Sequence, residues 1–482
     1  MLLPIVALSS LAVVTASPTA QHIRQSSQGT ATVDISNTHG PATFLGSGFI
    51  YGWPDNGTSV STLIPDYLVT GINFNANRAG GAQLPVGGWA TGGFSGYKTR
   101  FESALSNYRT TRKYGGEFIL LPHDMWGADG GSGSSSPFPG DNGDWTEMEA
   151  FWTQVMSDLM ENDMLDGLII DLWNEPDGSG FWPRSWDQFL EYWNRATVLV
   201  RYAPMWTFMC IHSAMSYRKA NHLRRERLPG TLISGPAMAN APGLQNENWL
   251  TWLPSIVGNN TVPDHYSWHQ IGVWERCPDL NVPDFNTLLS QFGAPARPID
   301  NNEYAWPSEQ NPANTAWYLS QMERHDIRAL RANWAGGSDL HNWMANLVYS
   351  KNGTYYPNGE WQVYNYYAGM SGERLVTTAS SDTQFDAFAI RQNNNIKILA
   401  GTRTIQAPYD IRVTNLNQIG LEENGSINVH VYRFDWDGPQ GEIDGRVDLG
   451  TTAYSYTSNE LIITLDPPTN STAYAYEFSG AS

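Results

Sequence analysis

A repeated alternation of short strand-like runs and longer amphipathic segments constrains the fold of this chain more than any other feature. We expect strands at 46–51, 70–75, 117–122, 167–174, 231–236, 264–269, 297–304 and 331–336. Helix-like segments lie between several of them, at 98–114, 145–163, 186–201, 284–292 and 313–328, and residues 361–369 form an expected last helix. Eight strands alternating with helices over roughly 300 residues predict an α/β protein with a (β/α)8 TIM barrel over residues 42–370. An open, doubly wound sheet is the alternative.

The pattern changes after residue 373. Short strand-like runs separated by turn residues lie at 386–391, 396–400, 409–414, 427–433, 461–465 and 473–478. They predict an accessory antiparallel β-sandwich domain over residues 373–482. The strand-like segment 29–36 precedes the barrel, which does not need it, so we assign it to the same domain.

Charge and composition argue against several classes of partner. The chain has 28 basic and 47 acidic residues, a net charge of −19. Nucleic acids and anionic membrane surfaces attract basic proteins, so we expect neither as a partner. The sequence contains no Cys/His spacing typical of a metal site and no phosphate-binding glycine loop, so we expect no metal and no cofactor. The absence of repeats argues against a structural cell-wall protein, and we expect a monomer.

Residues 1–20 have the pattern of a secretory signal peptide. The first 14 residues are nearly all apolar, and Val14-Thr15-Ala16 fits a small-residue cleavage site. This apolar run is too short to span a membrane. Five Asn-X-Ser/Thr sequons follow, at Asn56, Asn259, Asn352, Asn424 and Asn470. In a secreted chain such sequons are typical of glycosylated surface loops, so we expect an extracellular glycoprotein.

Residues 202–224 interrupt the expected order of helix and strand. A helix should connect to the next strand within a few residues, but here a segment without clear periodicity intervenes. One hypothesis is a translated, unspliced intron, because Arg201-Tyr202 can encode a GTAC donor and Leu223-Arg224 a CTCAG acceptor, in frame. A genuine surface insertion is the alternative. Cys210 lies in this segment, and the sequence does not show whether it pairs with Cys277.

Two segments each deliver a carboxylate to the end of an expected strand. In residues 168–176 (LIIDLWNEP) the strand ends before Pro176, which cannot donate a ladder hydrogen bond, and presents Glu175. Residues 297–305 (RPIDNNEYA) present Glu303 in the same way. These are the fourth and seventh strands, which face each other across the barrel mouth where active sites lie. Opposed carboxylates suit glycoside hydrolysis and stand about 5–5.5 Å apart in retaining enzymes. Two strand-end surface acids are the alternative.

On the WNEP and NEY motifs the chain resembles the clan A retaining glycoside hydrolases, and most of all glycoside hydrolase family 39 and its fungal relatives. The resemblance covers roughly residues 42–370, and the trailing sandwich also suits that family. It implies that Glu175 is the acid/base, that Asn174 holds the sugar 2-hydroxyl, and that Glu303 is the nucleophile. For these roles Glu175 needs a raised pKa, whereas Glu303 must stay ionised.

Other residues at expected strand ends are candidates for substrate binding. Arg78, which follows the second strand, could hold Glu303 ionised, and clan resemblance favours this over a surface arginine. After the third strand come His123, Asp124 and Trp126, which either bind substrate hydroxyls or cap and pack the loop.

The sixth and eighth strands add three more candidates. His269 ends the sixth strand, where the clan often places a residue that contacts the nucleophile; Tyr266 is its competitor, and a core histidine is the alternative. We choose Trp334 as the aromatic floor of the sugar site, with Trp306 and Trp343 as alternatives. Asp171 is expected to be buried and structural.

Together these features predict a secreted retaining glycosidase that acts on plant or microbial polysaccharide by double displacement. The alternative is a non-catalytic carbohydrate-binding protein on the same fold. Such a protein would keep the aromatic residues but would tolerate the loss of a carboxylate. Both carboxylates are present in this chain, which argues for the enzyme.

Overall fold

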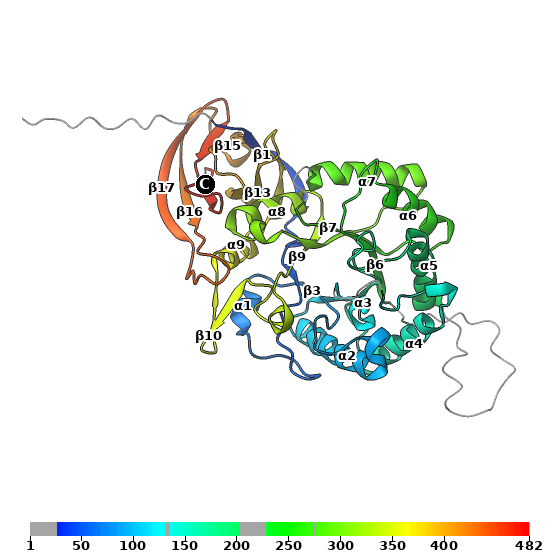
Figure 1. Ribbon diagram of the computed structural model, residues 1–482. Helices are drawn as coiled ribbons and strands as arrows, with labels where there is room; N and C mark the ends of the chain where they lie inside the picture. Colours follow the sequence, from blue (N-terminus) through cyan, green and yellow to red (C-terminus); the bar gives the residue numbers. More distant parts are fainter. Residues whose placement is uncertain (1–26, 131–134, 203–227, 229, 273–275, 482) are drawn as a thin grey trace, which may run out of the picture.

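The computed structural model describes residues 27–130, 135–202, 228, 230–272 and 276–481. It consists of a barrel surrounded by helices and a large sheet beside it (Figure 1). The predictions of a signal peptide at 1–20 and of an intron or insertion at 202–224 lie outside the described residues, apart from Tyr202 at the end of a helix. Cys210 is also outside them. Cys277 is buried and has no disulfide partner in the described part of the chain.

The predicted eight-stranded parallel barrel is confirmed, and its closure excludes the open sheet. Each strand pairs in parallel with its neighbour, and the last returns to the first. The strands are β2 (Gly48–Ile50), β3 (Ala76–Ala79), β4 (Glu117–Leu120), β5 (Leu168–Asp171), β6 (Leu232–Met238), β7 (His265–Gln270), β8 (Ile299–Tyr304) and β9 (Ile327–Arg331).

Helices surround the barrel because each buries one apolar stripe against the strands. In α4 the buried apolar positions recur every three or four residues, at Met148, Phe151, Trp152, Val155, Met156 and Leu159. The helices are α1 (Asp66–Thr70), α2 (Trp89–Lys113), α3 (Pro122–Trp126), α4 (Thr146–Glu161), α5 (Trp186–Tyr202), α6 (Glu247–Gly258), α7 (Pro278–Phe292), α8 (Pro312–Arg324) and α9 (Gly359–Ala368). Helix α6 was not expected, and Pro254 inside it conceals its pattern.

Two of the expected barrel strands were misplaced. The second strand is not 70–75 but β3, whose Asn77 and Arg78 are buried and polar and so hide the strand from an apolar pattern. The eighth strand is not 331–336 but β9, which carries the buried Arg328 and Arg331. In both cases buried ion pairs replace the apolar residues on which the prediction relied.

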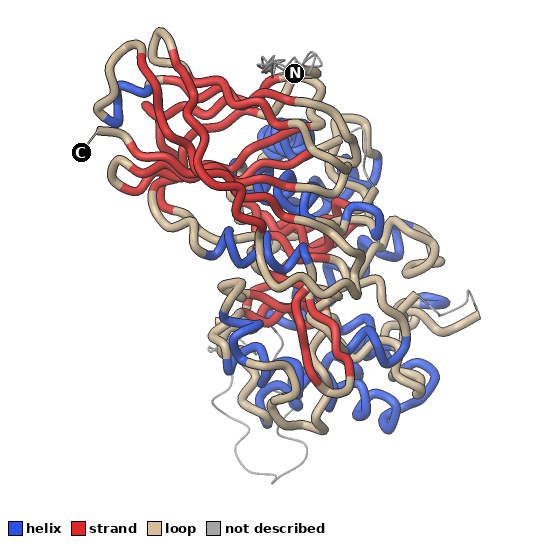
Figure 2. The backbone as a smooth tube through the Cα atoms, turned by 90° about the vertical axis from the view of Figure 1, so that its left-hand side faces the viewer, coloured by secondary structure: helices blue, strands red, loops and turns tan. Residues whose placement is uncertain are grey.

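A nine-stranded sheet forms the second body of the molecule (Figure 2). Its order is β17-β16-β19-β14-β13-β12-β1-β15-β18. Most pairs are antiparallel, as expected, but β1 (Thr30–Pro41) lies parallel to β15 and antiparallel to β12. The other strands are β12 (Glu373–Thr378), β13 (Phe385–Gln392), β14 (Asn395–Thr402), β15 (Tyr409–Thr414), β16 (Gly425–Phe434), β17 (Val447–Tyr456), β18 (Leu461–Leu465) and β19 (Ala473–Ser479). A hairpin of β10 (Val348–Lys351) and β11 (Thr354–Pro357) precedes α9.

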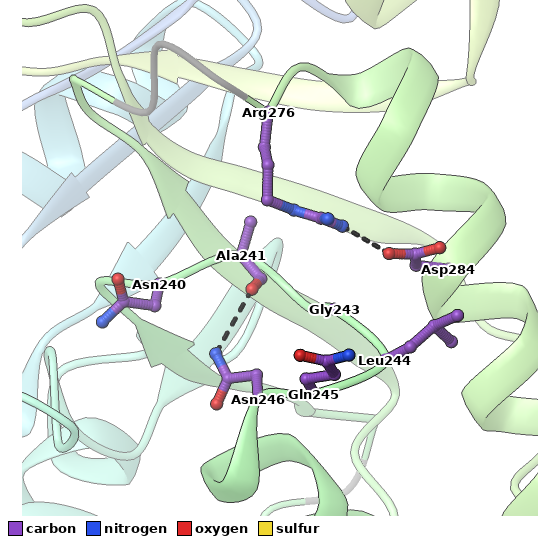
Figure 3. Close-up of a pocket in the computed structure, with 8 residues that line it drawn as sticks. All are labelled: Asn240, Ala241, Gly243, Leu244, Gln245, Asn246, Arg276 and Asp284. Carbon is purple, nitrogen blue, oxygen red and sulfur yellow. Dashed lines mark hydrogen bonds and ion pairs between the residues drawn. The ribbon is translucent and has the colours of Figure 1, made fainter.

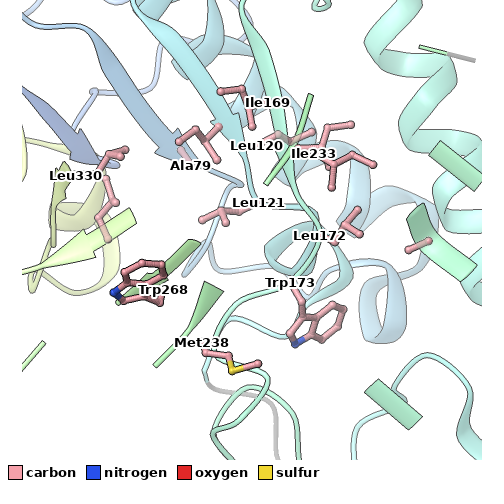
Figure 4. Packing of buried hydrophobic residues seen from close by; sticks show 14 of the residues in the cluster. Ala79, Leu120, Leu121, Ile169, Leu172, Trp173, Ile233, Met238, Trp268 and Leu330 are labelled. Atoms are coloured by element: carbon pink, nitrogen blue, oxygen red, sulfur yellow. The ribbon is translucent and has the colours of Figure 1, made fainter. Parts of the chain in front are cut away.

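The apolar core positions the barrel mouth. Ile169 and Ile233 from adjacent strands pack with Leu120 in the main cluster, and Trp173 extends this cluster toward the strand ends (Figure 4). A separate cluster fills the sheet domain. A third cluster joins α8 and α9 to the sheet through residues such as Phe388 and Leu399. The strand ends that carry the candidate residues therefore stand on a packed and rigid frame.

Candidate active site

Glu175 stands at the carboxyl end of the fourth barrel strand, as expected, but the strand itself ends earlier. The chain leaves the ladder after Asp171, and the backbone N–H of Glu175 donates to the carbonyl oxygen of Ala237 on β6 at 2.9 Å. Its φ of 42° lies in the left-handed region, which is uncommon for a residue with a side chain. Strained backbone of this kind clusters at functional sites, where the surrounding structure holds it.

Glu303 owes its direction to an irregularity in β8. Trp268 of β7 pairs with Asn301, whereas the next residue, His269, pairs with Glu303, so β8 carries one extra residue, Asn302. Such a bulge re-aims side chains. The amide of Asn302 donates to Asp171 at 2.7 Å, and the neighbouring Glu303 still reaches the site. Asn302 and Glu303 are consecutive in sequence, yet both side chains therefore contact residues of the site.

His269 lies between the two carboxylates. Its Nδ1 is 2.8 Å from Oε1 of Glu175, and its Nε2 is 3.7 Å from Oε1 of Glu303. The imidazole is fully buried, whereas the carboxylates keep 23% and 15% of their side-chain surface exposed. The expected pair therefore meets at one buried ring and remains open to the solvent side, where a ligand would enter.

The expectation that the pKa of Glu175 is raised is wrong for this arrangement. Burial raises the pKa of Glu175. The hydrogen bond from His269 and the charges of His269 and Arg78 outweigh this effect, so the pKa falls below its ordinary value. Burial lowers the pKa of His269, yet the negative charges of Glu303 and Glu175 raise it above its ordinary value. Both shifts favour a protonated His269 beside an ionised Glu175.

Arg78 ties three site residues together from β3. Its guanidinium donates to Glu303 at 2.7 Å, to Asp171 at 2.9 Å and to Oδ1 of Asn174 at 2.8 Å. Arg78 is fully buried; burial lowers its pKa, but Asp171 and Glu303 raise it on balance. Asn174 accepts through Oδ1, and its amide N–H groups have no acceptor among the residues that the structure describes. They are therefore available to a ligand hydroxyl.

His123 and Asp124 lie beneath the mouth rather than on its surface. Both are buried, and Nε2 of His123 lies 2.9 Å from Oδ1 of Asp124. The other oxygen of Asp124 accepts from the Tyr51 hydroxyl. Burial raises the pKa of Asp124, but His123 and Tyr51 outweigh this effect, so the pKa lies below its ordinary value. Nδ1 of His123 is buried without a hydrogen-bond partner among the described residues.

Two predicted site residues point away from the carboxylates. Trp126 donates its indole N–H to the carbonyl oxygen of Pro137 and packs edge-on against Phe151 of α4. Tyr266 packs against Phe285 of α7 and donates to the carbonyl oxygen of Pro295. The alternation of side chains along a strand explains the second case, because residues two apart share a face. His269 faces the barrel interior, so Tyr266, three residues earlier, faces the helices.

Trp334, which we predicted as an aromatic floor, packs edge to face against its alternative, Trp306, and the two rings form a corner. Trp334 follows the end of β9 and donates its indole N–H to the carbonyl oxygen of Ala305 at 2.9 Å. Its ring lies 4.7 Å from that of Trp306, nearly edge to face, and the two residues are 38% and 45% exposed. Trp343, the other alternative, instead packs against Tyr349. The exposed corner stands beside the strand that carries Glu303.

Sequence reasoning missed the supporting role of two residues, Asp171 and Tyr51. Asp171 was expected to be buried and structural; it is buried, but it also orients Arg78 and accepts from Asn302. Tyr51 orients Asp124. The signal for Asp171 was a charged residue inside an apolar run, because such a residue needs a buried partner. Among the described residues, no group of His, Cys, Asp and Glu side chains could hold a metal ion. Within the same residues, no helix is long and apolar enough to cross a membrane.

No family model and no curated protein matches the sequence, so the resemblance to family 39 stays a prediction. Solved structures do match. The structure of N2152 from Neocallimastix frontalis has 19% identity and a TM-score of 0.67, covering 94% of this chain and all of that one. A glucosidase from Croceicoccus marinus has 14% identity and a TM-score of 0.57, covering 94% and 99%. A glycoside hydrolase family 30 subfamily 8 xylanase from Clostridium acetobutylicum has 14% identity and a TM-score of 0.54, covering 93% and 99%. This chain therefore has the fold of these three proteins, among them the glucosidase and the family 30 xylanase.

Proposed function

We propose that this protein is a secreted glycosidase that hydrolyses O-glycosidic bonds of plant or microbial polysaccharide with retention of configuration. The observation that carries the proposal is the meeting of Glu175 and Glu303 at His269, with Arg78 on Glu303. A site built only for binding would not need two partly exposed carboxylates held in a buried ion-pair network. The fold of the solved relatives agrees with this function but does not establish it.

The geometry supports a double displacement. Glu303 attacks the anomeric carbon while Glu175 protonates the departing oxygen, and a glycosyl ester forms on Glu303. Glu175 then takes a proton from water, which attacks the ester and frees Glu303. In this proposal the proton for the first step starts on Nδ1 of His269, which the directions of both pKa shifts favour. A shift along the 2.8 Å hydrogen bond gives protonated Glu175 and a neutral imidazole, whose Nε2 N–H still faces Glu303.

The surface supports the proposal of secretion. All five sequon asparagines, Asn56, Asn259, Asn352, Asn424 and Asn470, are exposed. Glycan transfer needs an accessible asparagine, so none of these positions conflicts with a secretory route. The trailing sheet domain and the WNEP and NEY motifs support a relationship to family 39.

The test is kinetic. Glu303→Ala should abolish turnover of aryl glycosides, and added azide should restore it with an inverted product, because azide replaces the lost nucleophile. Glu175→Ala should spare substrates with good leaving groups and lose those with poor ones. Proton NMR of the first product anomer reports retention directly. Unchanged activity of Glu303→Ala, unchanged activity of Glu175→Ala on substrates with poor leaving groups, or an inverted wild-type product would contradict the proposal.

A further inference from the structure

A cavity opens at the same end of the barrel as the carboxylates. It has a volume of about 410 Å³ and lies between the loop from β6 to α6 on one side and Arg276 with Asp284 of α7 on the other (Figure 3). The residues that line it are Asn240, Ala241, Gly243, Leu244, Gln245, Asn246, Arg276 and Asp284. Its size falls in the range of about 300–1,000 Å³ that is typical of small-molecule sites.

The lining of this pocket is polar but nearly neutral. The Arg276 guanidinium contacts the Asp284 carboxylate at 2.6 Å, so the two charges compensate each other (Figure 3). Nε of Arg276 is buried and has no hydrogen-bond partner among the described residues, so it is the terminal nitrogens of the guanidinium that can face a ligand. Of the three amide side chains in the lining, that of Asn240 already donates to Asp177 and that of Asn246 caps α6, whereas that of Gln245 has no hydrogen-bond partner among the described residues and can donate and accept. This chemistry suits the hydroxyl groups of a neutral sugar better than an anionic ligand.

The pocket lies on the side of the general acid. Asp177, two residues after Glu175, accepts hydrogen bonds from the backbone N–H groups of Ala239 and Asn240 at 2.8 and 3.0 Å. The loop that carries Glu175 is thereby tied to the loop that lines the pocket. In the proposed reaction Glu175 protonates the leaving oxygen, so the leaving part of the substrate lies on this side of the cleaved bond. The indole corner of Trp306 and Trp334 lies beside Glu303, on the other side.

We propose that this pocket binds a neutral sugar unit of the leaving group. The inference rests on the proposed function and extends it: the substrate is an oligo- or polysaccharide that continues beyond the cleaved bond past Glu175. A substrate whose leaving group holds no sugar gains nothing from the pocket. The pocket therefore sets a preference for saccharide leaving groups over small ones.

The test compares two leaving groups on one sugar. The pairs are xylotriose with β-xylosyl fluoride, cellotriose with β-glucosyl fluoride, and arabinotriose with α-L-arabinofuranosyl fluoride. Leu244→Trp should fill the cavity and Gln245→Ala should remove one amide. Each should lower kcat/KM for the trisaccharide by about tenfold, the effect of one lost hydrogen bond or sugar contact. Neither should change kcat/KM for the fluoride of the same sugar by more than about twofold.

The matched control is Leu280→Trp on α7. Leu244 and Leu280 are similarly exposed, at 49% and 45%, but only Leu244 lines the pocket. The control should match the wild-type protein on both substrates, and thermal unfolding should show that all three variants are folded. Equal losses on both substrates, or no loss on either, would overturn the inference while the proposed function stands.

Two further outcomes have defined meanings. If pocket variants alter only substrates with a uronic acid in the leaving group, the assignment to a neutral sugar is wrong. If the wild-type protein cleaves neither member of any pair, the proposed function fails for these sugars, and the pocket assignment falls with it.

Discussion

Nδ1 of His269 lies 2.8 Å from Oε1 of Glu175, while Nε2 of the same ring lies 3.7 Å from Oε1 of Glu303. One buried imidazole thus lies within reach of both carboxylates. Burial opposes the charged ring, but Glu303 and Glu175 raise the pKa of His269 above its ordinary 6.5. Burial raises the pKa of Glu175, yet His269 lowers it below its ordinary 4.5.

The first prediction concerns the pH profile. We expect kcat/KM of the wild-type enzyme to fall on the basic side only above pH 6.5, because the proton for Glu175 is lost as His269 titrates through its raised pKa. His269→Gln should move this limb, since Glu175 must then hold the proton alone, with a pKa that burial raises and that His269 no longer lowers. A pH series of kcat/KM with one aryl glycoside measures it. A basic limb that stays in place in His269→Gln would contradict the proton assignment.

The same shifts predict how stability depends on pH. The pKa of His269 is raised on folding, so its contribution is fully present below about pH 6.5 and is lost as the pH rises through the raised value. The pKa of Glu175 is lowered, so its contribution is present above about pH 4.5 and is lost as the pH falls. The two together favour the window from pH 4.5 to 6.5. Urea unfolding across this range should show that His269→Gln loses stability mainly inside the window.

A second prediction compares two buried ion pairs. Arg78 and Asp171 are fully buried at the site, and Arg331 and Glu360 are fully buried away from the carboxylates. Asp171→Asn and Glu360→Gln each leave a buried arginine with less compensation, so each should lower the free energy of unfolding by about 3–5 kcal/mol. Only Asp171→Asn should also lower kcat, by about a hundredfold, because Arg78 and Asn302 lose their common anchor.

Chemical denaturation and kcat per folded molecule separate the two effects. Glu360→Gln is the control for destabilisation alone, since Glu360 contacts Arg331 and Thr315 and no site residue. An unchanged kcat in Asp171→Asn would mean that Arg78 keeps its position without this partner.

The positions of the barrel strands could be predicted where the strands are apolar, but not where they carry buried polar residues. Residues 168–171 are apolar apart from Asp171, and the expected strand is found there. Strand β3 was misplaced because Asn77 and Arg78 look like loop residues until their buried partners are known. A pattern based on hydrophobicity cannot contain partners that are nearly a hundred residues away in the sequence.

The site followed the same rule. The positions of Glu175 and Glu303 follow from strand ends, which a sequence displays. The contact of His269 with both carboxylates depends on the extra residue Asn302 in β8, which no periodicity reveals. Tyr266 was ranked beside His269 because the sequence gives their proximity but not the face that each presents.

A third prediction concerns the exposed indoles. We expect Trp334→Ala to raise KM for oligosaccharides by about tenfold. Packing of a sugar face on an indole contributes about 1.4 kcal/mol to binding, and a loss of that size corresponds to a tenfold weaker affinity. Trp306→Ala should have a similar but smaller effect, because Trp306 only flanks the ring that Ala305 holds in place. Michaelis–Menten kinetics on trisaccharides measure both. Trp343→Phe is the control, as Trp343 packs against Tyr349, and a similar rise in KM there would argue against an indole floor.

The fourth prediction addresses secretion. Expression of the full chain in a eukaryotic host should release protein into the medium with glycans on several of Asn56, Asn259, Asn352, Asn424 and Asn470, all of which are exposed. Peptide mass spectrometry before and after removal of N-glycans locates them, and the first residue of the secreted chain locates the cleavage site. Protein retained in the cell without glycans would contradict the secretory assignment.

The last prediction concerns residues 202–224. The strands on either side of this segment pair directly, Ile169 with Leu232 and Ile170 with Ile233. Arg201, at the end of α5, contacts the carboxylate of Asp264 at 2.8 Å, and Asp264 is the residue immediately before β7. A chain that joins Arg201 to residue 225 keeps a helix, a short loop and a strand, which is the usual connection in such barrels.

We therefore expect the chain without residues 202–224 to fold, with a thermal midpoint at least equal to that of the full chain, because a shorter loop has less entropy to lose. Its kcat/KM on aryl glycosides should be unchanged, since Glu175, Glu303 and His269 lie on other segments. Sequencing of the transcripts provides an independent readout. A major transcript without these codons identifies an intron, whereas a retained segment together with an inactive deletion variant identifies a genuine insertion on which the barrel depends.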